Sequence, residues 1–484
     1  MTPNPKTIDI VQIKCKISLL KLAQGEQSKS KGGGSFHQVK AGKVLHIFII
    51  YYNLVKEVIM KNRIFGMALA LVMVVAMIGG AVSCAPAPEV EPIVLGAPLS
   101  MGFPDGVDAE RGIKLAVEEI NAKGGVNVAG VMRPFKVEVM DTRDLEPGVP
   151  VSEALLVVEK LILEKKANFI IGGPIRSEAA LGVMDLLSKH KTVSILSAGV
   201  LSPAYHARVA EDYDKYKYSF RTTGSIVPMI GEVIETLESI KAEKGFDRIF
   251  IMVQDVAHAR ASGDAIKAGL EKKGGWNILG YEIYPTGSTD FSVGLLKAKD
   301  AGARFLFPWF DMPEVSILMK QWYDMKLAAL PIGYIHALQD AASWEATGGK
   351  IAYSVVLYAK AGCVATEAIP LAAKFIDAHK KKYGVEPVSE WTSTSYQVVY
   401  ILKDAIERAG TIDSDAVIAA LEKTDMMGTY GRIKFDPKSH QIVYSTDPAQ
   451  GAVGMWAQWL EGKRVAVFPP KIATQSLELP PWMK

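Results

Sequence analysis

The fold is decided where the regular part of the chain begins, in residues 93–126, which read IVLGAPLSMGFPDGVDAERGIKLAVEEINAKGGV. Residues 93–97 are mostly apolar and predict a buried strand. Residues 109–123 follow with apolar side chains three or four positions apart, which is typical of an amphipathic helix. The glycine pair at 124–125 ends that helix. The rest of the chain repeats this strand–helix unit.

The repetition predicts two α/β lobes. A second series of strand–helix units begins after residue 224. In addition, 484 residues are too many for one hydrophobic core. Repeated strand–helix units indicate doubly wound parallel sheets with helices on both faces. We expect strands at residues 93–97, 135–140, 169–172, 192–196, 248–253, 278–284 and 304–308, helices at 109–123, 151–165, 177–189, 227–244, 263–273, 291–301, 313–325, 371–382 and 394–409, and hairpin-like strands near 431–444 and 454–467.

A targeting segment precedes the lobes. Residues 64–82 carry no charge, follow a basic stretch at Lys61 and Arg63, and lead through small residues to Cys84. This order is typical of a bacterial lipoprotein signal peptide, so we expect residues 60–83 to be removed and Cys84 to carry the lipid. An uncleaved anchor helix and an ordinary secretory signal are the alternatives. Residues 84–92 are Pro-rich and predict an extended tether.

Residues 1–59 precede the methionine at which a signal peptide of this kind would start. The codons of Lys56, Glu57 and Val58 can form a purine-rich ribosome-binding sequence just before Met60. We therefore interpret residues 1–59 as an untranslated leader read in frame.

The charge balance depends on this processing. The whole chain has 55 Lys+Arg and 52 Asp+Glu, a net charge of +3. Residues 1–83 hold 11 of the basic and 3 of the acidic residues, so 44 basic and 49 acidic residues remain and the net charge becomes −5. Nothing in this balance favours nucleic-acid binding.

Catalytic motifs are absent from the sequence. It contains no nucleotide-binding glycine loop, no nucleophile elbow and no His-Glu-x-x-His, and its eight histidines lack metal-ligand spacing. Cys363 is the only thiol after Cys84, and we interpret it as an apolar filler. The sequence therefore predicts a binding protein without a cofactor rather than an enzyme.

Five stretches in order support that prediction. They are Ala97–Gly102 (APLSMG) with the stretch from Arg111 to Val126, Ile170–Gly173 (IIGG) with Ser177, Phe220–Thr223 (FRTT), Thr286–Ser292 (TGSTDFS), and Tyr430–Asp436 (YGRIKFD). Together they resemble the branched-chain amino-acid binding proteins, which are the type I periplasmic solute-binding proteins of ABC importers. The resemblance covers residues 91–470.

The resemblance implies how the lobes are connected. Three crossovers join the lobes in that family, and they match residues 219–223, 353–358 and 433–444. The first lobe would comprise residues 93–221 and 357–434, and the second residues 222–356 and 435–484. A ligand would be trapped in the cleft between them, where the carboxyl ends of parallel strands converge.

A first set of candidate ligand contacts lies in the first lobe. Residues 172–177 end a strand and open a helix, and free N–H groups at a helix start favour an anion. The resemblance implies that Ser177 helps to hold a carboxylate, although a plain N-cap role also fits a serine here. Gly199 and Leu201 fall on further carboxylate-binding positions. Leu201 replaces a threonine, which keeps the backbone donor and loses the hydroxyl.

Other candidates depart from the family pattern. Arg260, close to His258, stands in place of a tyrosine, and Asp105 stands in place of an aromatic residue, with Phe103 nearby. Trp309 and Phe310 match an aromatic pair that covers the ligand. The acidic residue that grips an α-ammonium, expected within residues 334–340, has only Asp340 as a poor substitute.

Arg176 and Arg260 would suit a second anionic group if both face the cleft, and either could instead point to solvent.

These observations predict a monomeric, lipid-anchored receptor outside the membrane that delivers a small-molecule ligand to ABC permease subunits. The expected ligand is a branched-chain amino acid or a related small amide or carboxylate. The first alternative is a ligand-sensing partner of a signalling receptor with the same fold. The second is an α/β enzyme, for which His258 with Asp255 is the only candidate pair.

The start site and the lipid can be tested together. Mass spectrometry of the precursor, accumulated by blocking the signal peptidase, should give an N-terminus at Met60, and the mature protein should begin at a lipid-modified Cys84. A peptide from residues 1–59 would contradict the interpretation of the leader.

Overall fold

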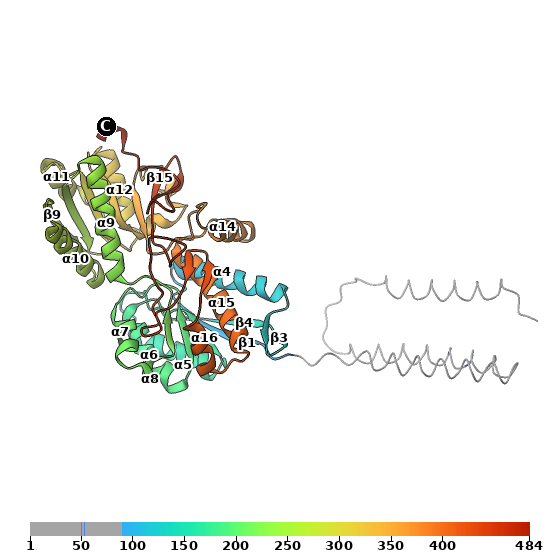
Figure 1. Ribbon diagram of the computed structural model, residues 1–484. Helices are drawn as coiled ribbons and strands as arrows, with labels where there is room; N and C mark the ends of the chain where they lie inside the picture. Colours follow the sequence, from blue (N-terminus) through green and yellow to red (C-terminus); the bar gives the residue numbers. More distant parts are fainter. Residues whose placement is uncertain (1–49, 51–52, 54–89) are drawn as a thin grey trace, which may run out of the picture. The chain divides into compact units, whose positions relative to one another are not determined.

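The computed structural model of the protein describes residues 50, 53 and 90–484. The expected leader, the signal peptide, Cys84 and most of the tether lie outside these residues. Among the described residues, no helix is long and apolar enough to cross a membrane. Residues 90–484 form one compact unit, which contains the two sheets described next (Figure 1).

The first lobe is built on a five-stranded parallel sheet with the strand order β4-β1-β5-β6-β7. The side chains of β5 and β6 are all buried, because helices cover the sheet. The strands are β1 (Ile93–Leu99), β4 (Phe135–Asp141), β5 (Phe169–Gly172), β6 (Val193–Leu196) and β7 (Ser219–Arg221).

Helices from two distant parts of the chain cover this sheet. α4 (Pro104–Ala122) and α15 (Glu390–Ala409) pack on each other, and α5 (Val151–Leu163) packs on α6 (Ser177–His190). The expected helix at 109–123 therefore begins earlier than predicted, with Pro104 in its first turn, where the fixed φ of proline suits a helix. The remaining helices of this lobe are α7 (Ala204–Glu211), α8 (Tyr213–Tyr216) and α16 (Ser414–Leu421).

The second lobe is built on a seven-stranded sheet with the order β16-β15-β12-β11-β10-β8-β9. Five strands are parallel, and the hairpin of β15 and β16 adds two antiparallel strands at one edge. The strands are β8 (Arg248–Gln254), β9 (Asn277–Tyr284), β10 (Phe305–Phe310), β11 (Leu330–Ile335), β12 (Val355–Tyr358), β15 (Met455–Leu460) and β16 (Lys463–Phe468).

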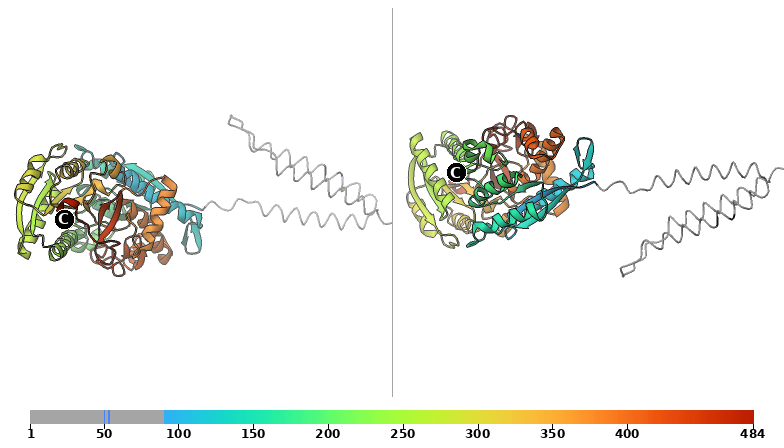
Figure 2. Two further views of the ribbon diagram at one scale, coloured as in Figure 1. Left: turned by 90° about the horizontal axis from the view of Figure 1, so that it is seen from above. Right: turned by 90° about the horizontal axis from the view of Figure 1, so that it is seen from below.

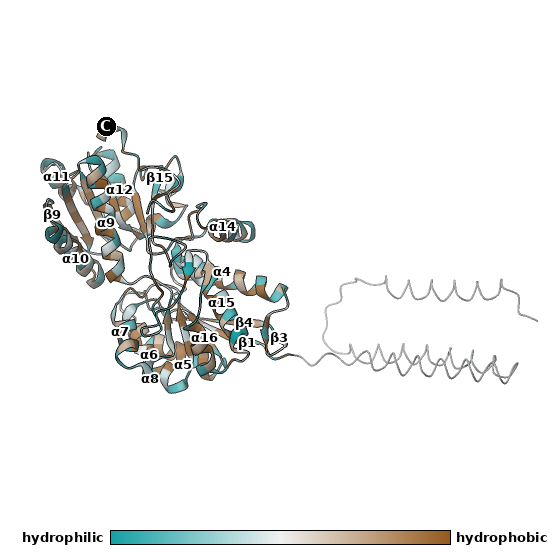
Figure 3. Cartoon of the chain, in the orientation of Figure 1, coloured by the Kyte–Doolittle hydropathy of each residue, from teal (hydrophilic) through white to brown (hydrophobic). Residues whose placement is uncertain are grey.

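The helices of the second lobe are α9 (Ile226–Lys244), α10 (Ala257–Lys273), α11 (Ser292–Asp300) and α12 (Val315–Asp324), with the short α13 (Ser343–Ala346) and η1 (His336–Gln339) after β11. The strands of both lobes are mostly hydrophobic, whereas the helices show both hydrophilic and hydrophobic residues (Figure 3). The chain ends on this lobe (Figure 2). There, η2 (Pro481–Met483) packs Trp482 against Trp322 and Tyr323.

The fold class expected from the sequence, two α/β lobes with parallel sheets, is confirmed. The strand–helix alternation of residues 93–325 is found in the expected order. Several short elements were not predicted: the hairpin of β2 (Val126–Val128) and β3 (Val131–Arg133), the strand β11, and the helices α7, α8, α13 and α16. Of the hairpin-like region 431–444, only β14 (Gly431–Ile433) is a strand, and it pairs with β13 (Met426–Gly428).

The chain passes between the sheets at three places. It leaves the first sheet after β7, returns after β12 toward α14 (Pro370–Tyr383), and leaves again between β14 and β15. β12 pairs with β11 and β15, so the expected lobe boundary at residue 357 falls inside a strand of the second sheet. Residues 441–442 lie beside β7, where the N–H of Ile442 donates to the carbonyl of Arg221 at 3.0 Å.

The close packing of α4 on α15 depends on Gly112. A Cβ at this position would lie 2.4 Å from the carbonyl oxygen of Thr392, and neither helix can move away without opening the core. Gly112→Ala should therefore lower the free energy of unfolding by about 1–3 kcal/mol, as overpacking does. Urea denaturation followed by circular dichroism measures it.

The matched control is Gly231→Ala on α9, because nothing lies within 4 Å of a Cβ there. This exposed helical position should gain about 0.5–1 kcal/mol, since alanine restricts the unfolded chain more than glycine does. Equal effects of the two substitutions would contradict the packing argument.

Candidate functional site

A small cavity, with room for about one water molecule, lies where the first lobe meets the first and second crossing segments. Each of these parts contributes to its wall: the loop after β6, the first crossing, the second crossing and the first turns of α15. The lining residues are Gly199, Leu201, Thr223, Gly224, Ala359, Lys360, Glu390, Trp391 and Thr394. Of the residues predicted from the sequence, Gly199 and Leu201 line this cavity.

The loop of residues 199–202 is held by Arg221. Its Nη1 donates to the carbonyls of Val200 and Ser202, both at 2.7 Å, and its Nε donates to Gln441 at 2.6 Å. The guanidinium is buried, and desolvation lowers the pKa of Arg221 to about 10, so it stays charged. The positive charge therefore lies directly behind the loop that faces the cavity.

The same loop presents two backbone donors. Gly199 has a φ of +59°, and a Cβ there would lie 2.4 Å from the carbonyl of Ile175, so only glycine fits. The N–H of Val200 donates to Ile175, whereas the N–H groups of Gly199 and Leu201 have no acceptor within residues 90–484. These two free donors can bind an anionic or carbonyl oxygen.

The helix start at Ser177 is occupied differently from what the sequence suggested. The carboxylate of Asp144 accepts the N–H groups of Ile175 and Arg176, both at 2.7 Å. A protein carboxylate thus takes the two N–H groups just before the helix and places its own negative charge there. Ser177 Oγ accepts the N–H of Ser202 at 3.3 Å, next to the loop of residues 199–202, and its role as a ligand contact stays a prediction.

Arg176 points away from the cavity. Its Nη1 donates to the carbonyl of Val149 at 3.3 Å, and its Nε lies 3.7 Å from Glu178. Phe103 is the N-cap residue of α4, and its carbonyl accepts the N–H groups of Gly106 and Val107. Neither side chain is part of the cavity wall.

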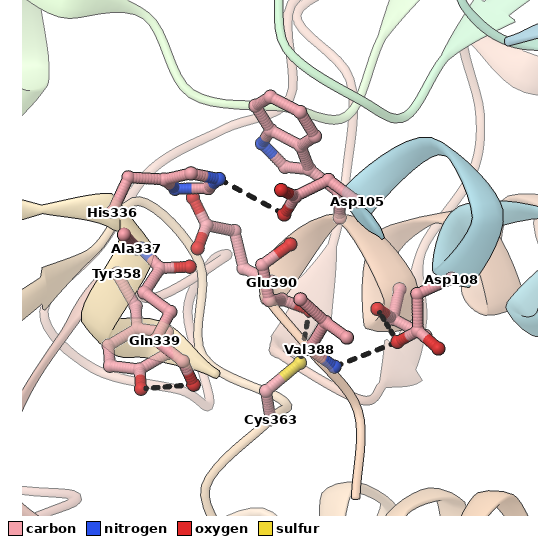
Figure 4. Close-up of polar contacts among 12 residues, drawn as sticks. Asp105, Asp108, His336, Ala337, Gln339, Tyr358, Cys363, Val388 and Glu390 are labelled. Atoms are coloured by element: carbon pink, nitrogen blue, oxygen red, sulfur yellow. Dashed lines mark hydrogen bonds and ion pairs between the residues drawn. The ribbon is translucent and has the colours of Figure 1, made fainter. Parts of the chain in front are cut away.

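Asp105 and His336 join the lobes. Asp105 lies in the first turn of α4 and His336 directly after β11, and their Oδ1 and Nε2 atoms are 3.1 Å apart (Figure 4). Burial alone would raise the pKa of Asp105 and lower that of His336, but the opposite charges outweigh it. The pKa of His336 rises to about 9 and that of Asp105 falls, so both are ionised at neutral pH.

His336 occupies the region where the family pattern led us to expect an acidic residue. Its Nδ1 lies 3.2 Å from the hydroxyl of Tyr334, and its ring is 4.9 Å from that of Trp391. Asp340, the substitute considered from the sequence, accepts the N–H of Ala342 at 2.9 Å and does not line the cavity.

The two aromatic candidates of the second lobe lie outside the cavity wall. Trp309 and Phe310 are adjacent on β10 and are both buried in the core of the lobe. The Trp309 ring is 5.1 Å from Tyr334, and the Phe310 ring is 5.9 Å from Phe291. Neither lines the cavity, because β10 is covered on both faces, so covering a ligand stays a prediction for them.

The polar candidates beside β10 form ion pairs within the lobe. His258 pairs with Asp311, and Arg260 pairs with Asp255. Although burial lowers it, the pKa of His258 is raised overall by Asp311. The pair of His258 with Asp255 considered for an enzyme is therefore wrong, because Arg260 takes Asp255. No group of side chains suited to a metal occurs among the described residues.

Both charged residues of the cavity wall were missed from the sequence. Glu390, at the start of α15, is 2% exposed, and neither of its carboxylate oxygens has a hydrogen-bond partner. Burial raises the pKa of Glu390 to about 7. Its side chain points toward His336 and Asp105 (Figure 4).

Lys360 is the second missed residue. It is fully buried, its ammonium donates to the carbonyl of Ala359 at 3.2 Å, and it lies 3.3 Å from the centre of the Tyr444 ring. Burial holds the pKa of Lys360 well below its usual value. A single charge in the otherwise uncharged segment 353–364 was the signal in the sequence.

Two α/β lobes that close on a cavity at their crossings define a ligand-binding protein of the periplasmic type. Residues 100–452 match the family model described as "Periplasmic binding protein". The chain therefore belongs to the periplasmic binding protein family, and the expectation that it is not an enzyme is confirmed.

One protein of similar sequence and one solved structure of similar fold illustrate the match. The chain is 26% identical over 388 residues to "Leu/Ile/Val-binding protein homolog 7" of Brucella abortus (strain 2308), which covers 78% of this chain and 90% of that protein. The branched-chain amino acid transporter substrate-binding protein of Streptococcus pneumoniae, solved with isoleucine, has a TM-score of 0.62 at 20% identity, covering 78% and 100% of the two chains.

A further protein of similar fold was solved with a different ligand. The solute-binding protein of an ABC transporter from Rhodopseudomonas palustris HaA2, solved with p-hydroxybenzoic acid, has a TM-score of 0.62 at 19% identity and covers 78% and 95% of the two chains. Proteins of this fold thus bind amino acids in one case and an aromatic acid in another.

The pair of Asp105 and His336 should make lobe closure depend on pH. Because the pKa of His336 rises from 6.5 to about 9, its contribution is complete below pH 6.5 and is lost as the pH rises through 9. The contribution of Asp105, whose pKa is lowered, is lost only in acid, below its usual value of 3.8. The radius of gyration from X-ray scattering, without ligand, should therefore increase between pH 6.5 and 9.5.

Asp105→Asn should remove this increase. Asp311→Asn is the matched control, since it breaks a His–Asp pair within one lobe and should leave the increase in place. An identical pH profile for wild type and Asp105→Asn would contradict the assignment of the pair as a contact that closes the lobes.

Proposed function

We propose that the protein is an extracytoplasmic solute-binding receptor of an ABC importer, which captures a branched-chain amino acid or a related small amide or carboxylate by lobe closure. The observation that carries the proposal is the cavity, because its wall comes from the first and second crossings and from the loop after β6 and the start of α15 in the first lobe. A ligand there contacts the whole wall only when the lobes are together.

Capture then needs no covalent chemistry. Binding energy that is available only in the closed state shifts the equilibrium between open and closed forms toward the closed form. The free N–H groups of Gly199 and Leu201, with Arg221 behind them, support binding of the carboxylate or carbonyl of such a ligand at this loop. Ser177, 3.3 Å from the N–H of Ser202, lies beside the same loop.

The proposal includes a membrane anchor. A lipid on Cys84 would hold the protein at the outer face of the cell membrane, and the tether of residues 84–92 would let the monomeric lobes reach the permease subunits. The sequence pattern around Cys84 supports this arrangement.

The function is tested by titrating the protein with L-leucine, L-isoleucine, L-valine and their amides in a calorimeter. At least one should bind saturably, and the radius of gyration should fall on binding. Ser177→Ala should weaken that binding about 3- to 10-fold, the equivalent of one neutral hydrogen bond.

Ser188→Ala, near the other end of α6, is the control and should bind as the wild type does. Unchanged affinity in Ser177→Ala would argue against the assigned carboxylate site. A lack of binding to any small solute would contradict the proposed function.

A further inference from the structure

A groove separate from the cavity at the crossings lies on the second lobe. Its volume is about 370 Å³, within the range of about 300–1,000 Å³ that small-molecule sites occupy. One side is a face of α9, and the other is the chain directly after β16 together with Thr446 of the third crossing. The groove shares no lining residue with the cavity at the crossings. From α9 it takes Glu232, Glu235, Thr236 and Ser239, whose spacing of three or four residues places them on one helix face.

The wall of the groove carries unpaired negative charge. Neither Glu232 nor Glu235 forms an ion pair within residues 90–484. Lys471, the one basic residue described in the wall, pairs with Asp447, which neutralises it. Two carboxylates therefore remain without a countercharge in contact, and they favour a cationic ligand.

Glu232 is the carboxylate in greater need of a partner. Its Oε1 is buried with no hydrogen-bond partner. The side chain lies against Gly454, where a Cβ would be 2.4 Å from Oε2, so the glycine leaves room for the carboxylate. Burial raises the pKa of Glu232 to about 7; of the two charged groups that face it, Lys360 opposes this shift and Glu235 adds to it. A buried carboxylate without a donor is costly, so a ligand donor placed here stabilises it.

The rest of the wall offers a further acceptor and apolar surface. Thr236 is 7% exposed, and its hydroxyl has no hydrogen-bond partner in the described part of the chain. Pro469 and Pro470 have no N–H, so they present no backbone donor to an anion, and with Phe468 they form an apolar surface. A primary ammonium on a hydrocarbon stem has three N–H donors and no acceptor, so it matches this wall better than a carboxylate or a phosphate does.

We propose that the groove binds a small primary aliphatic amine, with its ammonium at Glu232 and Glu235 and its hydrocarbon stem against the chain after β16. The site lies outside the cleft between the lobes, so the inference goes beyond the proposed function and does not depend on which solute the cleft binds. Free amines and the lysine side chains of a partner protein carry the same ammonium group, and the experiment distinguishes these two sources.

The first experiment compares probes that share one carbon chain and differ in the group at its end. Pentan-1-amine, pentan-1-ol and pentanoate are titrated into the isotope-labelled protein at about pH 8, where the carboxylate of Glu232 is mostly ionised. The amine should bind saturably and shift the amide NMR signals of α9. The alcohol and the acid should bind about 10-fold more weakly or less, because neither supplies the positive charge.

The peptide acetyl-Gly-Lys-Gly-amide is the second source of an alkylammonium. If pentan-1-amine binds more tightly than the peptide, the occupant is a free amine. If the peptide binds more tightly, the occupant is a lysine side chain of a partner protein. Either result supports an ammonium site.

The second experiment changes the two carboxylates. Glu232→Gln should weaken binding of pentan-1-amine about 10-fold or more, as loss of a buried charged partner does. Glu235→Gln should weaken it about 2- to 5-fold, since Glu235 is exposed and screened by water. Because Glu235 is exposed and unpaired, this variant should fold even if Glu232→Gln does not.

Glu243→Gln is the matched control. Glu243 is on the same helix, pairs with Lys244 and lies outside the groove wall. Its substitution changes the net charge by the same amount and should leave the affinity for pentan-1-amine within about 2-fold of the wild type, because charges at a distance are screened.

A third measurement identifies the carboxylate that meets the ammonium. A cation placed beside Glu232 lowers its pKa from about 7, so binding of pentan-1-amine at about pH 7 should release a fraction of a proton. Calorimetric titrations in phosphate and in Tris measure this release from the difference in heat. Glu232→Gln should release none, whereas a purely structural role of Glu232 would leave the release unchanged.

Three outcomes would overturn the inference. They are binding of neither the amine nor the peptide, binding of pentan-1-ol or pentanoate as tight as that of the amine, and an amine affinity that is equal in wild type and Glu235→Gln. None of them bears on the proposed solute receptor, because its ligands are tested with different compounds and at a different site.

Discussion

The buried guanidinium of Arg221 holds together the segments on which the cavity depends. It donates to the carbonyls of Val200 and Ser202 in the loop after β6, and to Gln441 in the third crossing. The backbone of Arg221 pairs with His440 and Ile442 on either side. Because Arg221 itself begins the first crossing, one residue sets where two crossings and the ligand-facing loop meet. The cost of burying its charge is offset by several carbonyl-type acceptors rather than by a carboxylate, so its field is not neutralised locally.

That field explains why an acceptor group is expected at the loop of residues 199–202 rather than at the start of α6. Both are loops at the carboxyl ends of strands, and both offer backbone N–H groups. At α6 the carboxylate of Asp144 accepts the two N–H groups before Ser177 and brings its own negative charge. At residues 199–202 the donors are free and the nearest fixed charge is positive. An acceptor group of a ligand is therefore favoured beside the positive charge at residues 199–202 and disfavoured beside the negative charge of Asp144 at α6.

The sequence predicted the fold well and the site only in part, for reasons that individual residues show. Alternation of apolar strands with amphipathic helices depends on local spacing, so residues 93–325 were predicted in the right order. Gly199 and Leu201 were found because a local family motif marks their loop. Glu390 and Lys360 carry no such motif, and they come from segments about 160 to 190 residues further along the chain. Only the folded chain brings them to the same wall as Gly199 and Leu201. Trp309 matched its motif position but lies in the core, because β10 is covered on both faces and the motif does not show this.

The free energy of the closed arrangement contains two opposing contributions. The ion pair of Asp105 with His336 favours contact between the lobes without any ligand. Two buried groups disfavour this contact. The carboxylate of Glu390 has no hydrogen-bond partner, and the ammonium of Lys360 has a single carbonyl acceptor, so burying them is costly. A solute that contacts both lobes adds a further favourable contribution in the closed form alone. It therefore has a differential affinity for the closed state, which is the only way a ligand can shift such an equilibrium.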